Sequence, residues 1–339
     1  MLIFIIRRLL TLPLVMLAVT LLTVGLMQFL TPQERAAAFI TNENQMRNLD
    51  RIIKEKGLDQ SFFVQYTSWI KEAVQGNLGF SKASSRSVMD TIRERFPATL
   101  ELALYAFIPL IGVGIWLGTI SSLNKDKLID QFVRIFTVIG YCLPTFVVGI
   151  VLLVIFYGAL NLLPGFGRVD SVLEIINPVP RVTGLITIDT VLAGQWTVLL
   201  DAIKHMILPV FTLAFVSSAG TIKVMRAQML DVLKSDYVRT ARAKGLSERT
   251  VNLKHARRNA LLPIVTLASF TVQGLLSGAV ITETIFAYPG IGSWGAQAAV
   301  QLDYPGVLGF AVFIALITVV FNVVADVAYG LVDPRVRFD

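Results

Sequence analysis

Uncharged, strongly apolar stretches recur along the chain, separated by polar segments. An α-helix needs about 20 apolar residues to cross the hydrocarbon core of a bilayer. Stretches of about this scale, each expected to form a transmembrane helix, are Leu9–Leu30, Leu102–Leu123, Ile135 to about Gly158, Met206–Ile222, Ala260–Thr282 and Tyr304–Ala325. The pattern predicts an all-α integral membrane protein with six transmembrane helices. The fourth stretch is the shortest, and we expect Lys204 and His205 to extend from its start to the membrane surface.

The polar segment 31–97 has a helical pattern of its own. Apolar side chains recur at helical spacing from Phe62 to Val74, directly after the capping sequence Asp59-Gln60-Ser61. Gly57 is expected to end a preceding helix over Leu49–Ile53. The segment is either a small folded cap or a platform for an extracytoplasmic partner, and the two interpretations are compatible. A later segment, Asn161–Asp201, is rich in Gly and Pro and is expected to stay irregular.

Composition supports the membrane assignment and excludes an ordinary soluble domain. Of 339 residues, 55% are hydrophobic and 16% charged, and the mean hydropathy is +0.68. The net charge of +7 could indicate nucleic acid, but the cations flank apolar stretches. We therefore expect them to face anionic membrane lipid, with no nucleic-acid partner. Cys142 is the one cysteine, so no internal disulfide is possible.

The distribution of Lys and Arg predicts the orientation of the chain. One set of segments is basic, and the opposite set has few cations or, in the long segment 31–97, a near balance of charge. The basic set comprises Arg7, Arg8, Lys125, Lys127, Arg134, the loop 223–260, Arg335 and Arg337. Both termini are therefore expected in the cytoplasm. The first apolar stretch exceeds the roughly 7–15 residues of a signal-peptide core, so we expect it to be retained.

These patterns divide the chain into four parts. Residues 1–30 form the cytoplasmic end and the first transmembrane helix, and 31–97 form a large folded external loop. Residues 98–332 form a five-helix core that includes the cytoplasmic loop 223–260, and 333–339 form a cytoplasmic tail.

The loop between the fourth and fifth apolar stretches is the most basic part of the chain. From Lys223 to Arg258 it carries ten Lys or Arg residues against three acids. Asp236 or Ser235 is a suitable N-cap, and the next residues, as far as Lys244, favour helix. Gly245 supplies a left-handed position at the helix end, with Leu246 as the apolar residue that follows it. Ser247 can cap a second helix that runs towards Pro263.

The amino-acid sequence of this loop resembles that of a known protein family. DYVRTARAKGL at Asp236–Leu246 and HARRNALLP at His255–Pro263 resemble the conserved cytoplasmic loop of bacterial ABC-importer permeases of the dipeptide, oligopeptide and nickel branch. Arg239 replaces the glutamate of the general superfamily motif, and the Leu-Pro pair falls five positions later, both as in that branch. Similar segments elsewhere are Gly57–Tyr66, Gly76–Ser81, Arg95–Leu104, Glu283–Gly292, Asp303–Pro305 and Asp333–Arg337. One departure is LTPQERAA at Leu30–Ala37, which lacks the P-G-D-P that often follows the first span.

The resemblance implies a type I importer permease in a prokaryotic inner membrane. Its partners would be a second related permease subunit, two ATP-binding subunits that hold ATP and Mg²⁺, and an extracytoplasmic substrate-binding protein. The cargo would be a di- or oligopeptide, with nickel, glutathione or an oligosaccharide as alternatives. A coupling helix would contact an ATP-binding subunit through residues drawn from Asp236, Tyr237, Arg239, Thr240, Ala241, Arg242, Lys244, Gly245 and Leu246.

The chain shows no catalytic pattern of its own. His205 and His255 are its two histidines and lie far apart in the predicted topology, so neither a metal site nor a Ser–His–Asp set is expected. The phosphate-binding pattern G-x-x-x-x-G-K-[ST] is absent from the sequence, so ATP is expected to bind elsewhere. We expect neither enzymatic activity nor a cofactor on this chain.

Polar residues near membrane depth are candidates for the transport pathway, since ionisable groups are costly there. Glu283 with Thr282 and Tyr288 could line an outer gate, and Gln273 could face the pathway or hydrogen-bond between helices. Glu101 and Asp326 are expected either to pack between helices or to have a partner at the membrane interface. A stand-alone secondary transporter or channel is the competing class, but such a protein typically shows an inverted repeat or a chain of buried acids and histidines. Neither is visible in this sequence.

Overall fold

The computed structural model describes residues 2–36, 49–276 and 279–332, most of them helical. The long helices are α1 (Leu2–Leu26), α5 (Val88–Leu123), α6 (Leu128–Cys142), α10 (Trp196–Val232), α14 (Leu262–Leu276) and α17 (Tyr304–Val332). The shorter elements are η1 (Met27–Phe29), α2 (Pro32–Ala36), α3 (Leu49–Lys56), α4 (Phe62–Val74), β1 (Phe80–Ser81), β2 (Arg86–Ser87), α7 (Thr145–Leu152), η4 (Leu153–Ala159), α8 (Ser171–Ile176), α9 (Ile186–Leu192), α11 (Asp236–Ala243), α12 (Glu248–Thr250), η5 (Val251–Ala256), α13 (Arg257–Ala260), α15 (Val280–Ile285) and α16 (Ile291–Val300). The predicted tail 333–339 and the side chains of Arg7 and Arg8 lie outside the described residues.

The predicted apolar stretches coincide with these helices. Within the described residues, α5, α10 and α17 are each long and apolar enough to cross a membrane. Two further helix pairs pass the same test together but are bent, α6 with α7–η4 by 103° and α12–α13 with α14 by 49°. The part of α1 over Pro13–Leu26 is apolar but shorter. Length and composition therefore support three to five spans.

Proline accounts for the sharper bend. Pro144 is the N-cap of α7 and directly follows Leu143, the C-cap of α6. Proline lacks a backbone N–H and disfavours helix at the residue before it, so α6 ends there and α7 starts in a new direction.

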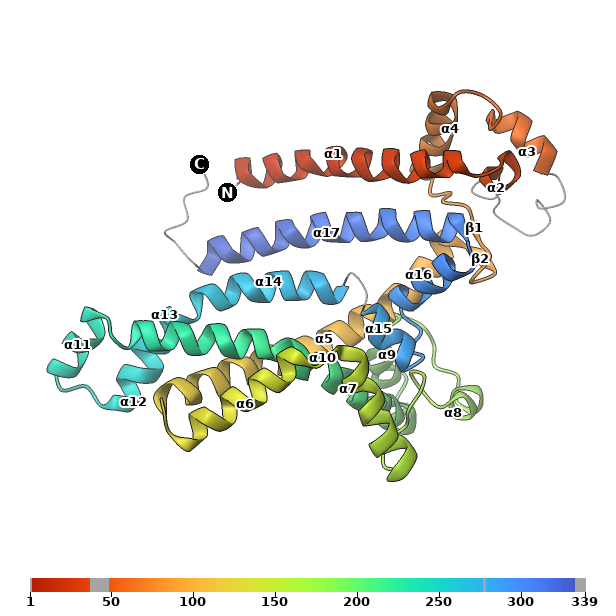
Figure 1. Ribbon diagram of the computed structural model, residues 1–339. Helices are drawn as coiled ribbons and strands as arrows, with labels where there is room; N and C mark the ends of the chain where they lie inside the picture. The colour runs from red at the N-terminus through yellow and green to blue at the C-terminus, as the bar shows by residue number, and fades with distance from the viewer. Residues whose placement is uncertain (1, 37–48, 277–278, 333–339) are drawn as a thin grey trace.

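The long helices run between two ends of the molecule (Figure 1). The start of α1 and the end of α17 lie at the same end as α11 and α12, while α2, α3 and α4 lie at the opposite end. α1 and α17 run side by side, and α5 packs along α10. The basic loop and the segment 31–97 are thus separated by the length of the helices, as the predicted topology requires.

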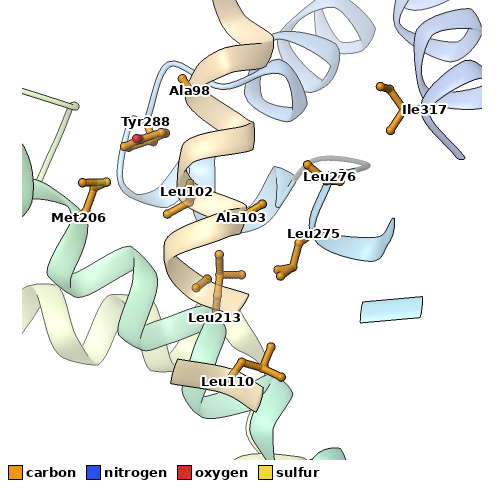
Figure 2. Packing of buried hydrophobic residues seen from close by; sticks show 11 residues of the cluster. Ala98, Leu102, Ala103, Leu110, Met206, Leu213, Leu275, Leu276, Tyr288 and Ile317 are labelled. Carbon is orange, nitrogen blue, oxygen red and sulfur yellow. The ribbon is translucent and has the colours of Figure 1, made fainter. Parts of the chain in front are cut away.

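α5 and α10 form the centre of the core. A cluster of buried apolar side chains joins them to α14 and α17, and Figure 2 shows Leu102 and Leu110 of α5 near Leu213 of α10. Gly114 and Gly118 of α5 face Thr221 and Met225 of α10, at distances that leave no room for a side chain. Small residues permit this close approach of two membrane helices, where packing takes the place of hydrophobic association.

The segment 31–97 is folded largely as expected. α4 covers the predicted residues with Ser61 at its N-cap, and α3 carries Leu49, Ile52 and Ile53 and ends at Lys56, directly before Gly57 at φ +62°. Two features were not predicted: a two-stranded antiparallel hairpin of β1 and β2, and the start of α5 at Val88, inside the predicted loop. The fully buried Asp303 accepts hydrogen bonds from the Ser81 hydroxyl and from the Ala83 N–H (3.0 Å), which fixes the hairpin beside α17.

Two other expectations were wrong. The segment Asn161–Asp201 contains α8, α9 and the start of α10, because Asp170 caps α8 and because Asp189 and Arg168 organise the chain around Gly184. Burial of Asp189 raises its pKa, but hydrogen bonds donated by Thr183 and Gly184 outweigh this effect and lower the pKa overall. His205 does not extend to a surface: it is buried within α10, and its Nδ1 lies 2.9 Å from the Asp201 carbonyl oxygen.

A glycine pair tests the packing of α5 on α10. In Gly118→Ala the new Cβ would lie 2.6 Å from Met225 Cβ and 2.9 Å from the Ile222 carbonyl oxygen. Overpacking of this kind costs about 1–3 kcal/mol, so we expect a lower thermal unfolding temperature in detergent. Gly112→Ala is the matched control, since its Cβ meets nothing within 4 Å and alanine favours helix. Equal unfolding temperatures for the two variants would contradict this packing.

Candidate functional site

α11 is a short helix with a well-defined end. Gly245 follows it at φ +76°, a conformation that glycine adopts without strain. The Gly245 N–H donates to the Arg242 carbonyl (2.9 Å) and the Leu246 N–H to the Ala241 carbonyl (3.4 Å). These two bonds make a Schellman motif, which satisfies carbonyls that a helix end otherwise leaves unpaired. The predicted glycine stop is confirmed.

The start of α11 and the helix after it also follow the sequence closely. Ser235 is the N-cap, and Asp236 lies in the first turn, where a carboxylate is favoured by the helix dipole. Ser247 caps α12 by accepting a hydrogen bond from the Thr250 N–H (3.4 Å). The second helix then continues through the π-helical segment η5 and through α13, bending before α14.

One face of α11 is anchored to the rest of the chain. Val238 is fully buried and Ala241 is 7% exposed. Both pack against Met225 and Met229 of α10 and against buried residues of η5, α13 and α14. Ala241, predicted to contact a partner, therefore belongs to the face of α11 that is buried against the rest of the chain.

The other face of α11 is open. The exposed residues of the predicted coupling set are Asp236, Tyr237, Arg239, Thr240, Arg242, Lys244, Gly245 and Leu246. Tyr237 and Leu246 are large apolar side chains at 45% and 41% exposure. The Arg242 Nε lies 2.9 Å from a Glu248 carboxylate oxygen, an exposed pair that joins α11 to α12. A capped helix with a rigid base and an open apolar and basic face is suited to docking.

A buried ion pair below α11 ties three helices together. Asp130 of α6 is fully buried, and Arg226 of α10 donates two hydrogen bonds to it, from Nε and Nη2, each 2.7 Å long. Ser121 of α5 donates to the same carboxylate, as does the Asp126 N–H (3.0 Å). Arg226 was counted among the cations of the basic loop, but its charge is neutralised inside the protein. Sequence reasoning missed this pair, although Asp130 is one of few acids that flank an apolar stretch.

A second buried pair holds the opposite end of α5. Glu101 is 1% exposed and binds Arg168, while the Thr187 N–H donates to its other oxygen (2.8 Å). Glu101 is therefore packed inside the protein with a charged partner, within the predicted alternatives, and the side chain of Asp326 lies outside the described residues. Arg168 also lines a cavity of about 520 Å³ whose other charged residues include Arg93, Arg95, Arg181 and Glu174.

Three predicted gate residues are buried where α15 turns into α16. Thr282 and Tyr288 are each 1% exposed and Glu283 is fully buried. The Glu283 carboxylate lies at the N-terminus of α16, where it accepts from the Ser293 N–H (2.8 Å) and from the Thr99 hydroxyl of α5 (2.7 Å). This arrangement fixes the turn against α5, and Figure 2 shows Tyr288 beside α5.

Gln273 lies apart from these three residues, half-buried on α14. A pathway role for Gln273, Thr282, Glu283 and Tyr288 stays a prediction.

The long apolar helices define an integral membrane protein, and comparison with known families identifies its class. The model of the binding-protein-dependent transport system inner membrane component matches residues 111–338, and its N-terminal companion matches residues 1–103. The chain therefore belongs to this family, whose members are multi-pass inner-membrane permease subunits. The peptide-importer resemblance of the sequence is thereby confirmed.

Curated relatives cover nearly the whole chain. It is 39% identical over 339 residues to the di/tripeptide transport system permease protein DppB of Pseudomonas aeruginosa (strain UCBPP-PA14), with 99% of each chain covered. It is 40% identical over 288 residues to the probable D,D-dipeptide transport system permease protein DdpB of Escherichia coli (strain K12), covering 85% of this chain and 84% of that one. The oligopeptide transport system permease protein AppB of Bacillus subtilis (strain 168) is 33% identical over 337 residues, with 99% of each covered.

Removing one partner from each ion pair near α11 distinguishes an internal lock from a surface contact. Arg226→Gln leaves the buried Asp130 carboxylate without its counter-charge, and we expect a loss of about 3–5 kcal/mol in unfolding free energy. Arg242→Gln removes the same charge from an exposed pair and should cost about 0–1 kcal/mol. Thermal unfolding of the purified permease measures both. Similar losses in the two variants would show that Asp130–Arg226 is not a buried lock.

Proposed function

We propose that this chain is one of two related permease subunits of an ATP-driven importer of di- or oligopeptides. Six transmembrane helices would place both termini and α11 in the cytoplasm, with 31–97 outside. Two ATP-binding subunits would carry ATP and Mg²⁺, and an extracytoplasmic binding protein would deliver the peptide. The chain itself would hold no catalytic site and no cofactor.

The geometry of α11 carries this proposal. A loop that only fixed topology would need positive charge but no defined shape. Here the Schellman motif at Gly245 and the buried Val238 hold α11 as a rigid unit against α10. When the ATP-binding subunits close, a force on the open face of α11 would move α10 as a body. Such a movement can bias two packings of the membrane helices, one open to each side.

The end of the molecule opposite α11 supports the other half of the cycle. Glu283 and Thr99 connect the α15–α16 turn to α5, and Glu101 and Arg168 connect α5 to the segment before α8. Because α5 packs along α10, a movement that starts at α11 reaches both contacts. We therefore assign Thr282, Glu283 and Tyr288 to the outer gate and leave Gln273 as a pathway residue of α14.

Purification distinguishes the importer from the competing class, a stand-alone transporter or channel. The importer proposal requires an ATP-hydrolysing subunit that stays bound to the permease. Full transport by the isolated chain without ATP would refute it.

Substitution of Gly245 tests the coupling role. Proline cannot adopt φ +76° and lacks the N–H that donates to Arg242, so Gly245→Pro should break the end of α11. We expect normal membrane insertion but peptide uptake at background level. Gly245→Asn is the matched control, since asparagine tolerates the left-handed conformation, and it should keep most of the uptake. Undiminished uptake by Gly245→Pro would overturn the coupling assignment.

Competition in a reconstituted system tests the cargo. The complete complex, supplied with its binding protein and ATP, should take up a radiolabelled dipeptide. An excess of unlabelled di- or oligopeptide should suppress this uptake, and Ni²⁺, reduced glutathione or an oligosaccharide should leave it unchanged. A complex with ATPase-inactive partner subunits gives the background level of uptake. Uptake of Ni²⁺, glutathione or sugar in place of peptide would assign the chain to one of the alternative cargoes.

A further inference from the structure

A cavity between α6 and α10 is not accounted for by the coupling loop or by the gate. Its volume is about 410 Å³. Most of the wall is apolar and includes Val133, Val138 and Ile222, but three cations also line it, Arg134, Lys223 and Arg226. No acid is among the lining residues.

Two of the three cations have no counter-charge. Asp130 neutralises Arg226 through two hydrogen bonds. Arg134 and Lys223 form no ion pair within the part of the chain that the structure describes, and both are exposed. The Lys223 Nζ instead lies over the ring of Tyr141, 5.8 Å from its centroid. The cavity therefore keeps two positive charges that an anion could neutralise.

The position of Lys223 argues against a lipid headgroup as the partner. Tyr141 lies six residues beyond Ile135, the first apolar residue of this stretch, which is about 9 Å along a helix. Lipid headgroups stay at the surface, and a lysine serving them would extend towards it. Lys223 was counted in the cytoplasmic loop 223–260, but the structure places it within α10, which continues to Val232, and its Nζ lies over the Tyr141 ring instead. An unpaired cation beside apolar walls, at the inner end of two predicted spans, is a candidate for a substrate pathway.

The proposed cargo has the matching charge. Every linear peptide ends in a carboxylate, whatever its side chains, and a lysine or arginine binds such a group through charge-assisted hydrogen bonds. We propose that the α6–α10 cavity receives the C-terminal carboxylate of the transported peptide, with Lys223 as its main ligand and Arg134 nearer the cytoplasmic end. This inference rests on the proposed peptide-importer function. Because Arg226 lines the cavity and also binds Asp130, the site is joined to the buried Asp130–Arg226 ion pair.

The one cysteine of the chain reports on this cavity directly. Cys142 lines it and is exposed. In the purified complex of the permease with its partner subunits, without nucleotide, dialanine or trialanine should slow maleimide labelling of Cys142. The C-terminal amides of the same peptides should not. Mass spectrometry assigns the label to Cys142, so cysteines of the partners do not interfere.

Variants identify the ligand. Lys223→Gln should raise the peptide concentration needed for half-protection about ten-fold or more, as expected for a lost charge-assisted hydrogen bond. Lys223→Arg should restore most of the protection. Lys234→Gln is the matched control: it removes the same charge just beyond the end of α10 without lining the cavity. Unchanged protection in Lys223→Gln, or equal protection by acid and amide, would overturn the proposal.

The remaining outcomes separate this inference from the function on which it rests. The same labelling can be measured with the complex reconstituted in lipid vesicles. If protection of Cys142 increases with the fraction of phosphatidylglycerol in the vesicles and does not depend on peptide, the cavity is a lipid site. Absence of any protection, in a complex that still takes up peptide, would refute the carboxylate site alone. A complex that takes up no peptide at all would refute the proposed function as well.

Discussion

The close contact between α5 and α10 is the constraint on which the rest of this structure depends. In a membrane, apolar surface gains little by leaving lipid, so two helices stay together through close packing and a few polar contacts. Gly114 and Gly118 provide the packing, because they let the backbone of α5 approach Thr221 and Met225. Polar contacts fix the two ends: Asp130–Arg226 joins α5, α6 and α10 near α11, and Glu101–Arg168 holds the other end of α5. The two helices are therefore connected to α11 near one end and to the α15–α16 turn near the other.

Through α10 and α5, a movement of the short helix α11 would reach the distant α15–α16 turn. α11 contacts α10 through Val238, and α5 contacts the α15–α16 turn through Thr99 and Glu283. Every link in this series is buried, and buried, well-packed contacts change between discrete arrangements and do not stretch continuously. The cavity with Lys223 lies beside the series, next to Arg226. Peptide binding and movement of α11 would thus act on the same helix.

Local patterns predicted local structure well. The end of α11 at Gly245 and the cap of α4 at Ser61 depend on backbone chemistry that single residues specify. The helix bends and long-range ion pairs could not be predicted in this way. Asp130 and Arg226 are 96 residues apart, and the sequence around either residue gives no indication that the two form an ion pair. The segment before α10 appeared irregular because the Asp170 cap of α8 was overlooked among its Gly and Pro residues, and because part of its order comes from Glu101 and Arg168, which are brought together only by the fold. For the coupling set, sequence predicted the loop correctly but could not separate the buried Ala241 from the exposed residues around it.

Protection of α11 by its partner tests the central claim most directly. Thr240 is exposed on the open face of α11, so Thr240→Cys in a Cys142→Ser background provides one reactive thiol on this chain. Its rate of maleimide labelling is to be compared between the permease subunits alone and the complete complex with the ATP-binding subunits. Docking through α11 predicts fast labelling in the first and strong protection in the second, with a further change when a non-hydrolysable ATP analogue closes the complex. Equal labelling of Thr240→Cys in all three states would contradict the account.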